Sequence, residues 1–190
     1  MRNGRLFVIS GPSGVGKSSL INDTLNDLSG FVKSVSFTTR PKRKNEITGK
    51  QYSFVTREEF EDLKKKDSFL EWASYCNYLY GTPKKFVIDQ LNAGKNVILE
   101  IEVKGAMQVK SKIKDAFLIF ITVASMKQLE ERISRLKDRL VKRGTDDTRE
   151  IKKRMNVAKN ELKYEKYYNC IIVNNNYNEA LINLKHVLLS

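Results

Sequence analysis

Residues 11 to 18 read Gly-Pro-Ser-Gly-Val-Gly-Lys-Ser, and the apolar run Leu6-Phe7-Val8-Ile9 stands directly before them. The stretch matches G-x-x-x-x-G-K-[ST], a glycine-rich turn from a strand into a helix. Its backbone N–H groups can point inward at a phosphate, because the glycines permit a tight loop. Lys17 then supplies a cation for the β- and γ-phosphates, and Ser18 an oxygen for Mg²⁺. The sequence therefore predicts a site for ATP or GTP formed by Gly11, Pro12, Ser13, Gly14, Val15, Gly16, Lys17, Ser18 and Ser19.

Length and charge limit the choice of partner. The 190 residues are enough for one sizeable domain with a buried core. Lys and Arg number 35 against 22 Asp and Glu, and the resulting charge of +13 favours an anionic partner. Acidic residues flank the run Lys64-Lys65-Lys66, so we interpret it as the solvated face of a helix. Nucleotide phosphates account for the charge as well as RNA does.

The cysteines, the single histidine and the apolar runs indicate where the protein works. Cys76 and Cys170 are too few for a disulfide framework and are not spaced for a metal site. No signal-peptide pattern opens the chain, and no apolar run approaches the ~20 residues that span a bilayer. His186 lies in a Leu/Val-rich helical pattern, which favours packing or surface exposure over catalysis. We therefore expect a soluble, cytoplasmic protein without a membrane partner.

Apolar runs alternate with helix-length amphipathic stretches. Near-continuous runs of this kind are typical of a parallel sheet covered by helices, so the predicted class is α/β. The expected strands are residues 6–9, 97–101, 117–123 and 170–173. The expected helices are residues 17–28, 83–92, 103–113, 127–142, 147–164 and 178–189.

Two segments interrupt the alternation. Residues 34–81 are rich in Ser, Thr, Tyr, Arg and Lys and are typical of an inserted lobe. Residues 127–159 are rich in arginine and carry a turn at Gly144 between two expected helices. Either segment could close over a nucleotide. Arg139 and Arg143 are four residues apart and share a helix face, whereas we interpret Arg132 and Arg135 as solvated charge.

Hydroxyls, guanidinium groups and one carboxylate within the inserted segment suggest a second substrate. Arg40 and Arg43 lie among several hydroxyls, which suits a monophosphate dianion. Glu71 stands in the apolar context Phe-Leu-Glu-Trp-Ala, and Thr82 follows at a turn. A buried carboxylate can accept two parallel hydrogen bonds from the N1–H and N2–H₂ edge of guanine, which adenine does not offer. Glu71 alone would be an ordinary surface residue, and only its neighbours favour GMP.

These motifs in this order resemble guanylate kinase. They are S-x-T-T-R-x-x-R-x-x-E-x-x-G-x-x-Y from Ser36 to Tyr52, then F-L-E-W-A and Y-G-T, and the resemblance covers nearly the whole chain. It implies a phosphate-loop core with a parallel sheet flanked by helices, an inserted GMP-binding lobe and a helical lid. The implied ranges are 1–33, 84–126 and 160–190 for the core, 34–83 for the lobe and 127–159 for the lid.

The resemblance also implies roles for individual residues. Glu100 would lie near Mg²⁺ with Ser18, Asn174 near adenine, and Glu71, Thr82 and Glu102 against guanine. Glu100 and Glu102 stand where many family members have Asp, and Lys104 stands where Gln is common. The lid would contribute the catalytic residues Arg139, Arg143 and Arg154, together with Lys17 of the loop. The phosphate side of the GMP site would comprise Ser36, Arg40, Arg43, Glu46, Tyr52 and Tyr80.

The expected reaction transfers the γ-phosphoryl group of ATP to GMP, with Mg²⁺ bridging the donor phosphates. Two alternatives remain at this point: a non-catalytic binding module of the same fold, and a monophosphate kinase with another base preference. The intact phosphate loop and the lid arginines argue against the first, and Glu71 with Thr82 argues against the second. An RNA-binding protein is less favoured, because no pattern of alternating basic and aromatic residues is present. Nucleic acid is therefore not an expected partner, and the oligomeric state stays open.

Overall fold

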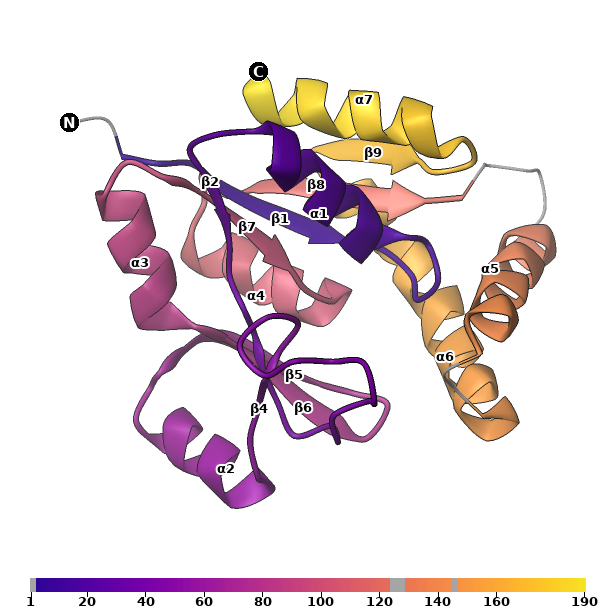
Figure 1. The fold of residues 1–190 in the computed structure, drawn as a ribbon, viewed down its shortest axis with the longest axis horizontal. Coiled ribbons are helices and arrows are strands. Elements are labelled where there is room, and N and C mark those ends of the chain that lie inside the picture. Colours follow the sequence, from indigo (N-terminus) through magenta and orange to yellow (C-terminus); the bar gives the residue numbers. More distant parts are fainter. Residues whose placement is uncertain (1–2, 124–128, 145–146) are drawn as a thin grey trace. The chain divides into compact units, whose positions relative to one another are not determined.

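A computed structural model of the chain describes residues 3–123, 129–144 and 147–190 (Figure 1). The chain forms two compact units. Unit 1 takes the segment that ends at Leu6 together with Gly30–Ala116, and unit 2 takes Phe7–Ser29 and Phe117–Ser190. Within the described ranges, no helix combines the length and the apolar character needed to cross a membrane. Cys76 and Cys170 are both free thiols.

Parallel strands form the centre of unit 2. They are β1 (Leu6–Ser10), β8 (Phe117–Thr122) and β9 (Cys170–Val173), with Ile9 opposite Ile119 and Ile121 opposite Ile172. All of β1 is buried, as is β8 from its second residue onward. Strands buried on both faces read as continuous apolar runs, which is why the sequence located them. The predicted α/β class with a parallel sheet flanked by helices is confirmed.

The helices of unit 2 follow the predicted pattern. Helix α7 (Tyr177–Leu189) packs on α1 (Lys17–Asp27), where Tyr177 donates to Asp23 at 2.5 Å. Helices α5 (Leu129–Arg143) and α6 (Thr148–Glu161) lie side by side (Figure 1), and the 3₁₀ helix η1 (Leu162–Tyr167) continues α6. Residues 127 and 128 of the expected helix 127–142 lie outside the described residues, as do residues 145 and 146 of the turn.

Unit 1 contains strands of two sheets. Strands β2 (Phe31–Lys33) and β7 (Asn96–Glu100) pair in parallel. A four-stranded sheet has the order β4-β3-β6-β5, in which β5 and β6 form an antiparallel hairpin. The hairpin turns at Cys76 and Asn77, which both have positive φ, as a tight turn between twisted strands requires. The strands of this sheet are β3 (Phe37–Thr38), β4 (Ser53–Phe54), β5 (Phe69–Tyr75) and β6 (Tyr78–Pro83).

Three helices complete unit 1: α2 (Arg57–Lys65), α3 (Lys84–Asn92) and α4 (Val103–Lys112). Helix α2 was not among the expected helices, although Lys64 and Lys65 do lie on it. It begins with a capping box, in which Thr56 accepts from the Glu59 N–H and the Glu59 carboxylate accepts from the Thr56 N–H. A buried cluster of Phe60, Phe69 and Leu79 joins α2 to the small sheet, and the Phe60 and Phe69 rings stack at 4.5 Å.

Candidate active site

The phosphate loop (residues 11–18) of unit 2 has a backbone that only glycine allows at its key positions. Gly11, Gly14 and Gly16 have φ of 149°, 86° and 95°. A Cβ on Gly11 would lie 2.0 Å from the Ile121 carbonyl oxygen, and one on Gly16 would lie 2.7 Å from Nδ2 of Asn174. The loop ends at the N-terminus of α1, and the backbone N–H groups at a helix N-terminus favour an anion. The local geometry is that of a phosphate cradle.

Lys17 bends back onto the loop. Its Nζ donates to the carbonyl oxygen of Gly11 and, at 3.2 Å, to that of Pro12. These are neutral acceptors, and a negatively charged phosphate oxygen attracts the ammonium group more strongly. Ser18 and Ser19 follow in the first turn of α1. The ammonium group can therefore exchange its carbonyl partners for a phosphate without leaving the loop.

Asn174 and Arg139 contact the loop from the far end of the sequence. The Asn174 Nδ2 donates to the Val15 carbonyl at 2.7 Å, and its side chain is 4% exposed. Arg139 donates to the Asn174 carbonyl at 2.9 Å and to the Val15 carbonyl at 3.3 Å. Burial, reinforced by nearby Arg135, lowers the pKa of Arg139. The structure thus brings together two predicted site residues and the loop.

Arg154 contacts the same loop from α6. Its Nη1 donates to the Ser13 hydroxyl at 3.0 Å, and its Nη2 donates to the Glu150 carboxylate at 3.1 Å. The residue is 8% exposed, which is unusual for arginine. The backbone of Arg143 ends α5, but its side chain lies outside the described residues.

Arg132 is not the solvated charge that the sequence suggested. Its guanidinium group donates to both carboxylate oxygens of Glu165, at 3.3 and 2.7 Å, and to the Thr122 hydroxyl. The side chain is 11% exposed, so this pair fastens α5 to η1. The partner lies 33 residues away, which explains why spacing along the helix gave no sign of it. Arg135 is exposed, as expected.

Sequence reasoning missed Glu161, the last residue of α6. It is 6% exposed, and its Oε2 has no hydrogen-bond partner within the described part of the chain. Burial raises its pKa to about 7, although the nearby Lys17 ammonium opposes the shift. Ile151, Arg154, Met155 and Ala158 are the other buried residues of α6. The three- and four-residue spacing of this set was a readable signal, because it puts Glu161 on the face that carries Arg154.

In unit 1, a carboxylate holds the two predicted phosphate-binding arginines. The Arg40 Nη2 donates to Glu46 Oε1 at 2.6 Å, and the Arg43 backbone N–H donates to Glu46 Oε2 at 2.8 Å. Burial disfavours the charge on both partners, but their hydrogen bond prevails: the pKa of Arg40 is raised and that of Glu46 is lowered. The sequence identified all three residues, and the structure brings them together.

Tyrosines border this cluster. The Arg40 guanidinium carbon lies 5.5 Å from the Tyr52 ring centroid, and the Tyr52 and Tyr80 rings meet edge to face at 5.7 Å. Ser36 is buried in the same small sheet, where its carbonyl accepts from the Ser53 N–H at 2.9 Å. Arg40 thus lies beside Tyr52, and the Arg43 guanidinium lies 4.0 Å from Glu46; guanidinium and phenol groups are suited to binding a phosphate.

Glu71 and Thr82 form a buried pair on β5 and β6. They are opposite one another in the hairpin, and the Thr82 hydroxyl donates to Glu71 Oε1 at 2.6 Å. Glu71 is 3% exposed and Thr82 is fully buried. Burial raises the pKa of Glu71 to about 7, whereas Thr82 and Lys112 favour the ionised form. Tyr80 and Thr82 are two residues apart on one strand, so their side chains share a face of the sheet.

Two further predicted residues follow β7. Glu100 pairs with Lys33 at 2.5 Å, and Glu102 precedes the first turn of α4. Burial raises the pKa of Tyr52, and the negative charges of Glu100 and Glu102 add to the shift, so both carboxylates are near the tyrosine. Lys33 gave no sequence signal, because its partner is 67 residues away.

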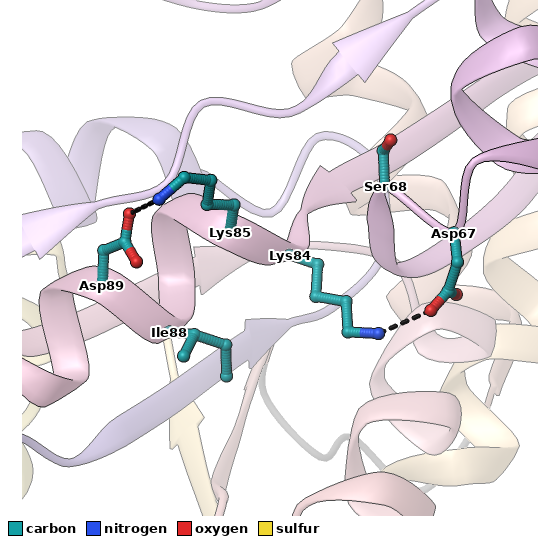
Figure 2. A pocket seen from close by; sticks show the side chains of 6 residues that line it. All are labelled: Asp67, Ser68, Lys84, Lys85, Ile88 and Asp89. Atoms are coloured by element: carbon teal, nitrogen blue, oxygen red, sulfur yellow. Dashed lines mark hydrogen bonds and ion pairs between the residues drawn. The ribbon is translucent and has the colours of Figure 1, made fainter.

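A shallow pocket of about 330 Å³ lies elsewhere in unit 1 (Figure 2). Its charged side chains already pair with one another: Lys84 with Asp67 and Lys85 with Asp89, both at 2.6 Å. Ser68 and Ile88 complete the lining. None of the predicted site residues is part of it, so we assign it no function.

Comparison with known proteins identifies the family. Residues 3–190 match the family model described as guanylate kinase. The guanylate kinase of Syntrophomonas wolfei is 40% identical, covering 100% of this chain and 93% of that protein, and the one of Lactiplantibacillus plantarum is 43% identical over 100% and 89%. A crystal structure of guanylate kinase from Anaplasma phagocytophilum superposes with a TM-score of 0.80 at 29% identity, covering 99% of this chain and 86% of that one. The chain therefore belongs to the guanylate kinase family.

Proposed function

We propose that the protein transfers the γ-phosphoryl group of ATP to GMP, giving ADP and GDP. The observation that carries this function is the match to guanylate kinases over residues 3–190. The protein is thus an ATP:GMP phosphotransferase, and its substrates account for the excess of positive charge. We infer a cytoplasmic location from these substrates.

The donor nucleotide is assigned to unit 2. The phosphate loop cradles the phosphates of ATP, and Lys17 neutralises charge on the transferred group. Arg139 and Arg154, with Arg143, act as the catalytic arginines of the lid. Asn174 lies beside the adenine end of ATP, and its bond to Val15 supports a second role in holding the loop.

The acceptor is assigned to unit 1. Arg40 and Arg43, oriented by Glu46, bind the phosphate of GMP together with Ser36, Tyr52 and Tyr80. Glu71, Thr82 and Glu102 read the guanine base. The Glu71–Thr82 bond supports this assignment, because it fixes a buried carboxylate that can accept from the guanine edge.

Mg²⁺ fits the residues assigned to it. Ser18 offers a hydroxyl and Glu100 a carboxylate, and oxygen ligands are those that Mg²⁺ prefers. Either residue would give Mg²⁺ one oxygen ligand, Ser18 in unit 2 and Glu100 in unit 1, where Glu100 also pairs with Lys33. When bound, it would neutralise charge on the phosphates of ATP.

Positioning and charge stabilisation account for most of phosphoryl-transfer catalysis. Residues 34–83 form the GMP-binding lobe, residues 127–159 form the lid, and the remaining residues form the core. Closure of lobe and lid excludes water, which limits wasteful hydrolysis of ATP. The loop contacts of Arg139 and Arg154 support their role in this step, since both guanidinium groups already lie at the donor phosphates' cradle.

The deciding experiment measures ADP formation from ATP and Mg²⁺ with GMP, AMP, CMP or UMP added separately. Stimulation by GMP alone, absent in the Lys17→Ala variant, is the expected result. Equal stimulation by another monophosphate would contradict guanine selection. A folded protein that binds ATP but responds to no monophosphate would instead be a binding module.

A further inference from the structure

Strand β5 departs from regular pairing at Glu71. Phe69 is opposite Pro83, but Glu71 is already opposite Thr82, so a step of two residues on β5 matches a step of one on β6. Leu70 is therefore the extra residue of a β-bulge. Bulges redirect the neighbouring side chains and recur beside functional sites. The orientation of Glu71 thus depends on how this irregular backbone is held.

Helix α4 holds the backbone on both sides of Glu71. The Lys112 ammonium donates to the Leu70 carbonyl at 2.6 Å. The Gln108 amide donates to the Trp72 carbonyl at 2.7 Å and accepts from the Trp72 N–H at 3.4 Å. Gln108 and Lys112 are four residues apart and thus share a face of the helix.

The same helix face makes room for the carboxylate. A Cβ on Gly105 would lie 2.3 Å from Glu71 Oε2, so glycine is required for this close approach. Gly105 is one turn before Gln108 and two turns before Lys112. One face of α4 therefore leaves space for the Glu71 carboxylate and forms hydrogen bonds with the peptide groups before and after it.

We propose that Lys112 and Gln108 are positioning residues that orient Glu71 and thereby set the preference for guanine. This inference rests on the proposed reading of guanine by Glu71. Two parallel hydrogen bonds tolerate little misalignment, and a buried donor left without its acceptor loses much of the binding energy. Lys112 also favours the ionised form of Glu71, which is the form that accepts both bonds.

The test compares GMP with IMP, whose base lacks the 2-amino group. We would measure kcat/KM for both acceptors, and KM for ATP, in Lys112→Met and Gln108→Met. The expected result is a fall of about tenfold in the preference for GMP over IMP, the scale of one impaired hydrogen bond, with KM for ATP unchanged. Lys112→Arg, which keeps a cationic donor, should restore most of the preference.

A matched control separates this effect from a general loss of charge or stability. Lys114→Met removes an exposed lysine just beyond α4 and should behave as the parent protein. Thermal unfolding of each variant shows that the fold persists. A merely structural role for the pair would lower activity towards GMP and IMP alike and leave their ratio unchanged, which would overturn the proposal.

Glu71→Gln, measured in parallel, distinguishes the positioning role of Lys112 and Gln108 from the assignment of guanine to Glu71. If this variant loses the preference while Lys112→Met and Gln108→Met keep it, the positioning role is wrong and the guanine assignment stands. If Glu71→Gln keeps the preference as well, the guanine assignment and the positioning role both fail.

Discussion

Lys17 and Arg139 in unit 2 have a different kind of hydrogen-bond partner from Arg40 in unit 1. In unit 2, Lys17 bonds to the carbonyls of Gly11 and Pro12, and Arg139 bonds to those of Val15 and Asn174. In unit 1, Arg40 is paired with the Glu46 carboxylate at 2.6 Å. Neutral oxygens thus hold Lys17 and Arg139 in unit 2, where Arg154 also contacts the Glu150 carboxylate at 3.1 Å, whereas a carboxylate holds Arg40 in unit 1.

This difference separates an exchangeable site from a fixed one. A carbonyl oxygen carries only a partial negative charge and a carboxylate carries a full one, so a cation leaves carbonyl partners for a phosphate more readily than it leaves a carboxylate. In the proposed donor site, Lys17 and Arg139 would be able to change partners when a phosphate binds. Arg40 instead keeps its orientation through its bond to Glu46, so the proposed GMP site would be arranged before its ligand binds.

Among the residues that the structure describes, each unit contains one buried glutamate, and burial raises the pKa of both to about 7. Glu71 in unit 1 accepts a hydrogen bond from Thr82. Glu161 in unit 2 has an oxygen with no partner in the described ranges. Burial raises the pKa of both groups; Glu71 is the proposed guanine-binding residue, whereas Glu161 has a buried oxygen without a partner in the described residues and lies near Lys17.

The largest effect should come from removing an exchangeable cation. Lys17→Ala should lower kcat by about 10²- to 10³-fold, the usual loss on removing one preorganised group that stabilises charge in the transition state. Steady-state assays with saturating ATP and GMP measure it, and circular dichroism checks the fold. Lys159→Ala, at an exposed position on α6, is the control. A rise in KM with normal kcat would mean that Lys17 stabilises the ground state and the transition state equally.

The next largest effect is on stability and comes from replacing the buried Glu161 of unit 2. A carboxyl group with a raised pKa stabilises the fold below its unfolded pKa of about 4.5, and this stability is lost as the pH rises through about 7. The loss amounts to about 3 kcal/mol. Glu161→Gln stays neutral, so its advantage in free energy of unfolding should grow from pH 5 to pH 8.

Urea unfolding at several pH values tests this prediction. Glu131→Gln, exposed on α5, should change neither the stability nor its pH dependence. If Glu161→Gln were less stable than the parent protein at pH 8, the carboxylate would be a stabilising partner of Lys17 and the contrast with Glu71 would disappear.

The fixed site of unit 1 is tested by Glu46→Gln. The amide keeps the shape but removes the charge that holds Arg40, so KM for GMP should rise by about 30-fold, or about 2 kcal/mol. KM for ATP should stay the same, and Glu58→Gln on the exposed start of α2 should have no effect. A lower KM for GMP would show that Glu46 competes with the phosphate and that this site, too, exchanges its partners.

The sequence predicted more of unit 2 than of unit 1. The phosphate loop and α1 are contiguous in the sequence, so one motif predicted both their residues and their geometry. The long strands β1 and β8 were visible as apolar runs, because burial on both faces demands them. Helix α6 was visible as well, and only its buried Glu161 escaped notice.

The small sheet of unit 1, by comparison, was not predicted from the sequence. Strands β3 and β4 have only two residues each and pair across more than ten residues of intervening chain. The sequence identified Glu71 but not the hydrogen bonds from α4 to the backbone beside it, because Gln108 lies 36 residues from Trp72. Residue types suggested the candidate site groups, whereas the groups that hold them in place come from distant contacts that no local pattern records.

The smallest effect concerns the pH dependence of GMP binding. Because burial raises the pKa of Glu71 to about 7, the carboxylate becomes mostly protonated as the pH falls from 8 to 6. A protonated carboxyl cannot accept both guanine hydrogen bonds, so KM for GMP should rise about tenfold over this range. Glu71→Gln should lose this part of the profile while keeping the part due to the phosphate of GMP itself. Identical profiles would mean that Glu71 does not titrate at the base, and only Glu161 would then remain as a buried acid with a measurable pH signature.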